Sequence, residues 1–287
     1  MVSVIIPVYN NKNTIERAVR SVVHDPLVSE ILVVDDGSRD GSLEIAHGLS
    51  GLFPKVNVLG HEERRNKGAA ATRNLGLSLS KNPWIQFLDA DDAVLPGKIE
   101  GQIALVSRDT PFVVGNSVHV FSDGKRYPRK SDREVWKGLI RSKLGDTCAN
   151  LWNRQFLVDV GAWDESLASS QEYDLMFRLV CLNPKVVFDA RYLTLIYKTA
   201  NSISTSPDKR AIRIHNWLAL RERIRMHLIA EKIFDLKKRY YWSGAVGQFC
   251  VEHGVDVPSF VESSFFRLYR SELSLKMKIS HILKPRV

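Results

Sequence analysis

The stretch that decides the fold is WIQFLDADD, residues 84–92. Its first part, Trp84–Leu88, is a short and mostly apolar run, typical of a strand buried on both faces. Its second part places Asp89, Asp91 and Asp92 directly after that strand. Carboxylates held this close repel one another, so the pattern favours a bound cation. The alternative is a solvated acidic loop before a helix.

Strands and helices alternate upstream of this stretch. Three further strands are predicted over Val2–Val8, Glu30–Val34 and Lys55–Leu59. Three helices are predicted between these strands. The first runs from a capping box at residues 13–16 to near Pro26, the second covers Ser42–Leu49 and the third covers Asn66–Ser80. This alternation is typical of an α/β domain with a mainly parallel sheet flanked by helices.

The chain beyond residue 100 is mixed at first and then helical. Extended segments are predicted over Pro111–Asn116, Ser117–Phe121, Val186–Asp189 and Leu193–Tyr197, and helices over Arg133–Leu144 and Glu172–Cys181. From about Pro207 the pattern is helical. One stripe at three- and four-residue spacing contains Ile214, Trp217, Leu218, Arg221, Ile224 and Leu228.

The composition is that of an ordinary globular protein, with 287 residues, 44% hydrophobic and 25% charged. No run approaches the roughly 18–20 apolar residues of a membrane span. MVSVIIPVYN (1–10) lacks the basic start of a signal peptide. The three cysteines are widely spaced and fit neither a metal finger nor a disulfide framework. We therefore expect a protein of the cytoplasm.

The net charge of +9 lies almost wholly in the C-terminal segment. Residues 1–206 carry a net charge of +1, and residues 207–287 carry +8. Such a segment can face nucleic acid, anionic lipid or an anionic substrate. Because it contains no nucleic-acid-binding motif, we expect no nucleic-acid partner.

Polar side chains follow three of the four predicted strands. Tyr9 and Asn10 follow the first, Asp35 and Asp36 the second, and the DADD run at residues 89–92 the fourth. The carboxyl ends of parallel strands share one edge, where ligands bind. Each cluster alone could be a turn or a helix cap. Together they predict a ligand site at this edge.

The acidic run predicts a metal that holds a diphosphate. Asp89 and Asp91, spaced by one residue, can face one ligand, and hard oxygen ligands select Mg²⁺ or Mn²⁺. Neither G-x-G-x-x-G nor a Walker A loop occurs. GAAATRNLG (68–76) is predicted as a helix near the ligand, with Arg73 and Asn74 available to the diphosphate. A surface salt bridge is the alternative for Arg73.

A family resemblance rests on four ordered motifs and one downstream stretch. VSVIIPVYN (2–10), VVDDGSRDGS (33–42), NKGAAATRNLGL (66–77) and WIQFLDADD together resemble the N-terminal half of family 2 glycosyltransferases with the GT-A fold. NRQFLVDVGAWDESLASSQEYDLMFRL (153–179) resembles the acceptor half of that family. The resemblance implies a nucleotide-diphosphate sugar donor, a divalent metal and inversion at the anomeric carbon.

The same resemblance divides the chain and assigns its donor residues. Residues 1–100 would bind the nucleotide sugar, residues 101–206 would form the acceptor and catalytic half, and residues 207–287 lie outside as a basic helical segment. The motif positions place Pro7 and Tyr9 beside the nucleoside and Asp36 on the base, expected to be uracil. Asp89 matches the carboxylate near the ribose or metal, Asp91 the principal metal ligand, and Asp92 a residue that orients the loop.

Inversion needs one carboxylate to take the proton of the acceptor hydroxyl. The family often has a Glu-Asp pair whose second member is this base, and here the pair is Gln171-Glu172. We therefore predict Glu172 as the base, with Asp174 as its rival. Asp174 faces another direction, because two residues along a helix lie about 200° apart. The alternative is that both acids only favour a helix N-terminus. Trp163 could stack on an acceptor sugar or belong to the core.

The chain lacks the Gln-x-x-Arg-Trp motif and membrane helices of the processive members of the family. We therefore expect transfer of a single sugar to a carbohydrate or lipid-linked acceptor. The basic helices beyond residue 207 predict a peripheral place on the anionic inner face of a membrane, or else simply pack on the catalytic domain. The competing classes are a sugar-phosphate nucleotidyltransferase and a non-catalytic nucleotide-sugar-binding module.

Overall fold

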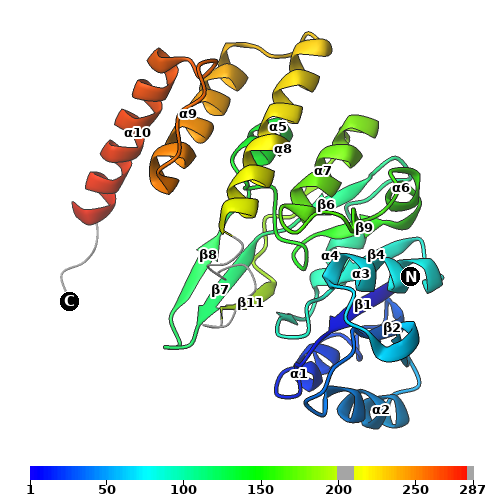
Figure 1. The fold of residues 1–287 in the computed structure, drawn as a ribbon. Coiled ribbons are helices and arrows are strands. Elements are labelled where there is room, and N and C mark those ends of the chain that lie inside the picture. Colours follow the sequence, from blue (N-terminus) through cyan, green and yellow to red (C-terminus); the bar gives the residue numbers. More distant parts are fainter. Residues whose placement is uncertain (199–209, 283–287) are drawn as a thin grey trace.

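The computed structural model describes residues 1–198 and 210–282, so the predicted boundary at 206/207 lies outside the described residues. Its larger sheet has the strand order β10-β6-β9-β4-β1-β2-β3 (Figure 1). These strands are β1 (Val2–Val8), β2 (Val28–Asp35), β3 (Val56–Gly60), β4 (Trp84–Phe87), β6 (Phe112–Val114), β9 (Leu151–Asn153) and β10 (Val187–Phe188). Strands β3, β2, β1 and β4 run in parallel. The predicted α/β fold with a mainly parallel sheet is confirmed.

Strand β1 is covered on both faces, as its unbroken apolar run predicts. Val4, Ile6 and Val8 belong to the core on one face, and Ile5 belongs to the core on the other. The first face is covered by α1 (Ile15–Arg20), α2 (Ser42–Leu52) and α4 (Lys98–Ile103), and the second by α3 (Ala69–Leu79), α6 (Arg154–Asp159) and α7 (Gln171–Leu182). Alternate side chains of a strand point to opposite faces, so one short strand joins both cores.

Strand β9 was not predicted from the sequence. It lies between β4 and β6 and pairs antiparallel with both. Only three residues long, it carries no periodicity that a sequence reading could use. Its Trp152 is fully buried and stacks on Phe112 at a centroid distance of 5.3 Å.

A second sheet has the order β5-β11-β7-β8. Its strands are β5 (Ala93–Val94), β7 (Ser117–Phe121), β8 (Arg126–Arg129) and β11 (Thr194–Lys198). Gly115 and Asn116, which lie between β6 and β7, therefore carry the chain from one sheet to the other. Strand β5 follows the DADD run directly, so this run lies where the two sheets meet.

The predicted capping box at residues 13–16 is wrong. Helix α1 begins one residue later, after Thr14, whose side chain makes no cap; its hydroxyl donates to Asn11 O at 3.3 Å. Glu16 pairs with Arg20 one turn along instead, at 2.7 Å. The helix ends at Arg20, well before Pro26, and turns complete the connection.

The C-terminal segment forms α8 (Arg210–Ala230), α9 (Leu236–His253) and α10 (Ser263–Ile282), which stand side by side with α8 next to α7 (Figure 1). Along the predicted stripe, Arg221, Ile224 and Leu228 are buried, and the last two join the core that contains α5 (Val135–Ile140). The stripe thus packs on the core beside α5 and α7. Among the described helices, none combines the length and the apolar character that a membrane span requires.

Helix α3 lies unusually close to β1, and this closeness depends on Gly76. A Cβ at this position would lie 2.5 Å from Ile5 Cγ2, inside the core. We expect Gly76→Ala to destabilise the protein by about 1–3 kcal/mol, because overpacked cores lose stability on this scale. Urea denaturation measures this loss.

Gly48 in α2 provides the matched control, because nothing lies within 4 Å of a Cβ added there. Gly48→Ala should raise the free energy of unfolding by about 0.5–1 kcal/mol, since alanine favours a helix over glycine. Equal effects of the two substitutions would contradict the close packing of α3 on the sheet.

Candidate active site

The loops after β1 and β2 hold each other by hydrogen bonds. Asn10 N donates to Ser38 Oγ at 3.0 Å, and Arg39 N donates to Asn10 Oδ1 at 2.9 Å. Asp35 accepts from the backbone of Gly37 at 3.1 Å and of Ser38 at 3.2 Å. Asp35 is therefore a turn residue. Nearby, Tyr9 is 44% exposed.

Asp36 is buried beneath the loop formed by residues 61–68. Its two carboxylate oxygens accept from Lys67 N at 2.7 Å and Gly68 N at 3.0 Å. The turn beside it needs Gly37, where φ is +79° and an added Cβ would lie 2.5 Å from Arg64 O. In this conformation a base could reach Asp36 only by sharing or displacing these amides.

The carboxylates after β4 crowd one another. Asp92 is 3% exposed, and its Oδ1 accepts from Tyr197 N at 2.9 Å, which holds the loop against β11. Burial, together with the charges of Asp89 and Asp91, raises the pKa of Asp92 to about 8. Burial and Asp89 also raise the pKa of Asp91. A cation is what relieves such repulsion.

Three ligand atoms lie close enough together to hold a metal ion. The nearest oxygens of Asp89 and Asp92 and the sulfur of Cys148 are all within 4.8 Å of one another. Asp91 lies outside this group but lines the same cavity. Hard carboxylate oxygens suit Mg²⁺ or Mn²⁺, so Asp89 and Asp92 fit such an ion. Cys148 does not, because sulfur is a soft ligand and burial raises the pKa of its thiol. Cys148 was not predicted, because it lies 59 residues from Asp89 along the chain and no sequence motif links the two residues.

Arg73 binds the acidic loop from α3. Its Nη2 donates to Asp89 Oδ1 at 2.7 Å, and its Cζ lies 4.8 Å from the ring centroid of Trp163. Burial alone would lower the pKa of Arg73, but Asp89 raises it above its usual value. The predicted alternative of a surface salt bridge does not hold, because Arg73 is 8% exposed.

Asn74 and Trp163 are joined by a reciprocal pair of hydrogen bonds. Trp163 N donates to Asn74 Oδ1 at 3.0 Å, and Asn74 Nδ2 donates to Trp163 O at 2.9 Å. The amide predicted to reach the diphosphate thus fixes the loop before α7. Trp163 is 2% exposed and lies edge-on to Phe87, with Arg73 over its ring.

A cavity of about 770 Å³ joins the acidic loop to the C-terminal helices. Arg73, Asp89, Asp91 and Cys148 line one part of it, and Glu172 lines it at the start of α7. Helices α8 and α9 complete the wall with Arg210, Arg213, Ile214, Trp217, Arg221, Phe249 and His253. Sequence analysis placed these helices outside the catalytic part of the chain, so their contribution to the cavity is a finding of the structure.

Glu172 and Asp174 face different parts of the molecule, as predicted. Glu172 Oε2 accepts from Thr147 Oγ1 at 2.6 Å and lines the cavity. Burial, followed by the charge of Asp146, raises the pKa of Glu172 above its usual value. Asp174 is 2% exposed and lies in ion pairs with Arg178 at 2.8 Å and Arg223 at 2.6 Å. Asp174 therefore joins α7 to α8.

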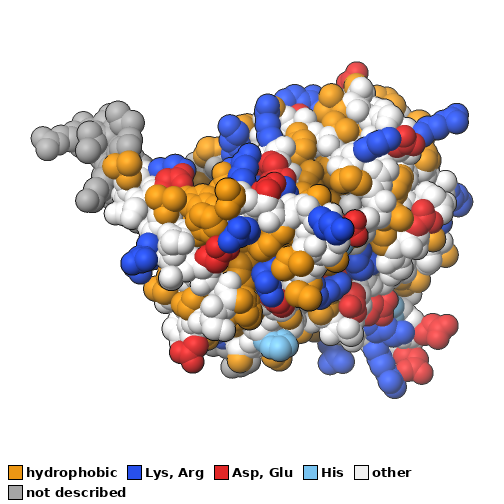
Figure 2. Space-filling model, turned by 90° about the horizontal axis from the view of Figure 1, so that it is seen from above, with side chains coloured by type: hydrophobic (Ala, Val, Ile, Leu, Met, Phe, Trp, Pro, Cys, Tyr) orange, Lys and Arg blue, Asp and Glu red, His pale blue; other side chains and the backbone are white. Residues whose placement is uncertain are grey.

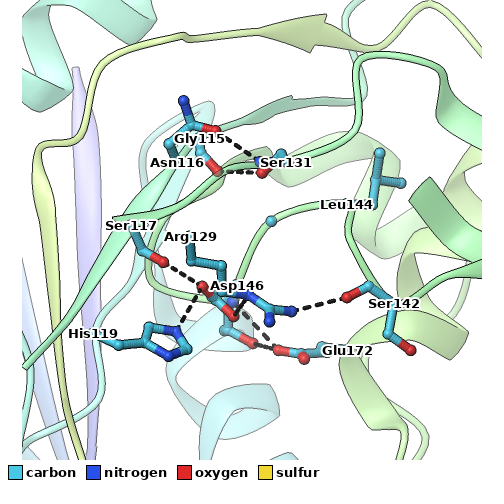
Figure 3. A network of polar contacts seen from close by, with 12 residues as sticks. Gly115, Asn116, Ser117, His119, Arg129, Ser131, Ser142, Leu144, Asp146 and Glu172 are labelled. Atoms are coloured by element: carbon cyan, nitrogen blue, oxygen red, sulfur yellow. Dashed lines mark hydrogen bonds and ion pairs between the residues drawn. The ribbon is translucent and has the colours of Figure 1, made fainter. Parts of the chain in front are cut away.

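Asp146 is the centre of a polar network beside Glu172 (Figure 3). It accepts from Ser117 Oγ at 2.6 Å and pairs with Arg129 Nε at 3.1 Å. Burial alone would raise the pKa of Asp146, but His119 and Arg129 outweigh it, and the pKa is lowered. Sequence analysis missed this network, because its members come from β7, β8 and the loop before β9.

Two serines that line the cavity have left-handed backbone. The φ angle is +52° at Ser142 and +59° at Ser170, the residue before α7. Residues other than glycine rarely adopt these backbone angles, and such strain is concentrated at functional sites. The strained turn at Ser170 directs the first residues of α7 into the cavity.

Solved structures with the same architecture define the class. The chain superposes with a TM-score of 0.62 on S. aureus TarS 1-349 in complex with UDP-GlcNAc, at 17% identity, covering 91% of this chain and 82% of that one. The TM-score is 0.60 with mannosyltransferase PcManGT from Pyrobaculum calidifontis in complex with GDP-Man and Mn²⁺, at 14% identity, covering 96% and 80%. The fold is that of the GT-A glycosyltransferases.

Sequence comparison narrows this class to one family. The family model described as Glycosyl transferase family 2 matches residues 3–164, and the chain belongs to this family. It is 31% identical over 228 residues to the succinoglycan biosynthesis protein ExoU of Rhizobium meliloti, covering 71% of this chain and 64% of that protein. It is 32% identical over 177 residues to glycosyltransferase AglE of Haloferax volcanii, covering 58% and 57%. The chain thus spans less than two thirds of the length of either relative.

Proposed function

We propose that this protein transfers one sugar, with inversion, from a nucleotide-diphosphate sugar to an acceptor hydroxyl in the assembly of a polysaccharide or glycolipid. The observation that carries this proposal is that one cavity is lined both by the carboxylates that fit a divalent cation and by Glu172. The relatives named above, among them a succinoglycan biosynthesis protein, support the setting. The titles of the similar solved structures favour UDP-GlcNAc or GDP-Man as the first donors to test.

The donor half would hold the nucleotide at the ends of β1, β2 and β4. Tyr9 and Pro7 would contact the nucleoside, and Asp36 would bind the base once the amides above it give way. Asp89, Asp91 and Asp92 would hold Mn²⁺ or Mg²⁺, which supplies charge stabilisation for the leaving diphosphate. Arg73 keeps Asp89 in position and adds a positive charge to this part of the cavity.

The acceptor half would supply the base. The acceptor oxygen attacks the anomeric carbon as the bond from that carbon to the diphosphate oxygen breaks, and the hydroxyl proton passes to the Glu172 carboxylate. The Thr147 hydroxyl orients this carboxylate, since it donates to Oε2 at 2.6 Å. We assign Trp163 to supporting Arg73, because its ring is already covered by that guanidinium.

The first test measures nucleoside-diphosphate release and donor binding over a panel of nucleotide sugars. We expect turnover of one donor with Mn²⁺ or Mg²⁺, and loss of turnover with EDTA or in Asp91→Ala. In a parallel assay with nucleoside triphosphates and sugar phosphates, release of pyrophosphate would instead indicate a nucleotidyltransferase. Donor binding without turnover would indicate a non-catalytic module, and absence of donor binding with every metal would contradict the proposal.

A second test separates Glu172 from Asp174. Glu172→Gln should lower kcat by about 10²–10⁴-fold, because general-base catalysis contributes on this scale, and should leave donor binding unchanged. Asp174→Asn, the matched control two residues along α7, should keep most of the wild-type kcat while lowering stability through the loss of its ion pairs. A greater loss of kcat in Asp174→Asn would move the base to that residue.

The pH dependence follows from the same assignment. Glu172 acts as a base only when deprotonated, and its pKa lies above the usual glutamate value. The rate should therefore be full above this raised pKa and fall as the pH drops through it. Glu172→Gln should lose this limb of the profile.

We also propose that the basic helices lie on an anionic membrane surface. Leu268 and Leu275 of α10 are each 59% exposed and share a helix face, and residues 267–287 hold six Lys and Arg against one acid. Figure 2, which views the upper ends of these helices, shows hydrophobic side chains interspersed with Lys and Arg and with some Asp and Glu. Such helices bind membranes because their apolar side chains are buried in the lipid and their Lys and Arg side chains are attracted to anionic head groups.

Liposome sedimentation tests this proposal. We expect more protein to sediment with vesicles that contain anionic lipid than with neutral ones, and several-fold less of the double variant Leu268→Ser, Leu275→Ser. Leu52→Ser is the control, since Leu52 is 65% exposed on α2, in the donor half. Equal sedimentation with both kinds of vesicle would exclude the membrane surface as a partner.

A further inference from the structure

Arg221 of α8 is a buried cation without a carboxylate partner. It is 1% exposed, and its Nε donates to Ile140 O at 3.2 Å. Its Nη2 donates to Leu139 O at 3.3 Å and also to Ser142 Oγ. Its Nη1 has no hydrogen-bond partner, and none of the carboxylates in the described part of the chain forms an ion pair with it.

An unpaired buried charge is costly, so its presence calls for an explanation. Burial lowers the pKa of Arg221 to about 9, which still leaves the guanidinium charged at neutral pH. A planar guanidinium binds the oxygens of phosphates and carboxylates with paired hydrogen bonds. Arg221 lines the cavity and its enclosed Nη1 lacks a partner, so an oxyanion that displaces the atoms now covering Nη1 would complete its hydrogen bonds.

A stack of rings fixes the Arg221 guanidinium in the wall. Its Cζ lies 4.0 Å from the ring centroid of Trp217, which stacks on Phe249 at 3.8 Å and 7°. Phe249 in turn stacks on His253 at 4.0 Å. The faces of Trp217 and Phe249 are thus occupied, and these rings support the cation rather than offering a platform for a sugar.

Arg221 lies near the start of α7, where Glu172 is found. Tyr173 follows the base directly, and Arg221 Cζ is 5.7 Å from its ring centroid. Arg129 Nη2 donates to Ser142 O at 2.8 Å, and the hydroxyl of the same serine contacts Arg221 (Figure 3 shows Arg129, Ser142 and Glu172). Arg73 pairs with Asp89, one of the predicted metal ligands, whereas the contacts of Arg221 described above involve none of these carboxylates.

We propose that Arg221, assisted by Arg129, binds an oxyanion carried by the acceptor, so that the acceptor is an anionic saccharide bearing a phosphate or carboxylate group. This inference rests on the proposed glycosyltransferase function and adds the chemical class of the acceptor. The competing explanation is purely structural: Arg221 binds the carbonyls at the C-terminal end of α5, where a cation is also stabilised.

The test is calorimetric titration of the full chain saturated with Mg²⁺ and the nucleoside diphosphate that the donor assay identifies. Three probes are titrated separately: inorganic phosphate, glucuronic acid and glucose. The bound nucleotide fills the donor diphosphate site, so an oxyanion that binds must use another one. The first two probes distinguish a phosphate from a carboxylate, and glucose reports on a neutral sugar.

Two conservative variants of α8 form the matched pair. Arg221→Lys keeps the charge but loses the planar fork, whereas Arg223→Lys changes a 52% exposed side chain that pairs with Asp174 outside the cavity. We expect one oxyanion to bind wild type and Arg223→Lys at least tenfold more tightly than glucose, and Arg221→Lys to lose at least fivefold. If Arg221→Lys does not fold, Arg129→Lys, whose side chain is 34% exposed, carries the same expectation.

The result that would overturn the inference is oxyanion binding no tighter than glucose binding in wild type, or unchanged in the Arg221 variant. Arg221 would then be a structural residue at the end of α5. Nucleoside-diphosphate binding is measured in the same samples. Its absence in wild type would contradict the proposed function itself, whereas its presence without oxyanion binding would contradict only the class of acceptor.

Discussion

The ion pair between Arg73 and Asp89 is the interaction on which the site depends. The pair joins α3 to the end of β4, and the same guanidinium lies over Trp163 in the segment before α7. Three segments that are far apart in the sequence thus meet at one cation. Because Arg73 is 8% exposed, water screens this contact little, and the crowded carboxylates beside it are held in one geometry.

The helix that carries Arg73 can take this position only because its sheet-facing side is nearly bare. Gly76 lets α3 approach Ile5 of β1, and the small residues before it continue the same close face. The small residues of GAAATRNLG (68–76), which predicted a helix near the ligand, are therefore also required for packing on the sheet. Asn74 adds the bonds to Trp163 that fix the loop leading into α7.

The first four strands of the larger sheet were predictable because the information for them is local. Strands β1, β2 and β4 are short apolar runs followed at once by polar residues, and a parallel sheet brings those ends together. The position of Glu172 at the start of a helix was also predictable. The roles of Asp35, Asp36 and Asn74 were less predictable. Their side chains form hydrogen bonds with backbone groups, and no spacing along the sequence reveals these partners.

The rest of the site could not be predicted because it depends on long-range contacts. Thr147 and Asp146 lie on a loop before a three-residue strand. Their roles depend on contacts with β7, β8 and α7, which are distant in the sequence. Arg221 left one signal in the sequence: it is the charged member of an otherwise apolar stripe. A charged residue in such a stripe indicates a buried polar group, but the sequence does not show which groups lie next to it.

The wall that α8 and α9 add to the cavity has a consequence for how such proteins diversify. Strands β1, β2 and β4 and the acidic run are complete by residue 92, whereas the cavity residues of α8 and α9 begin at residue 210. Under the proposed function, an exchange of these helices would change the acceptor and leave the nucleotide-sugar donor unchanged. The two specificities would then lie in two separate stretches of one gene.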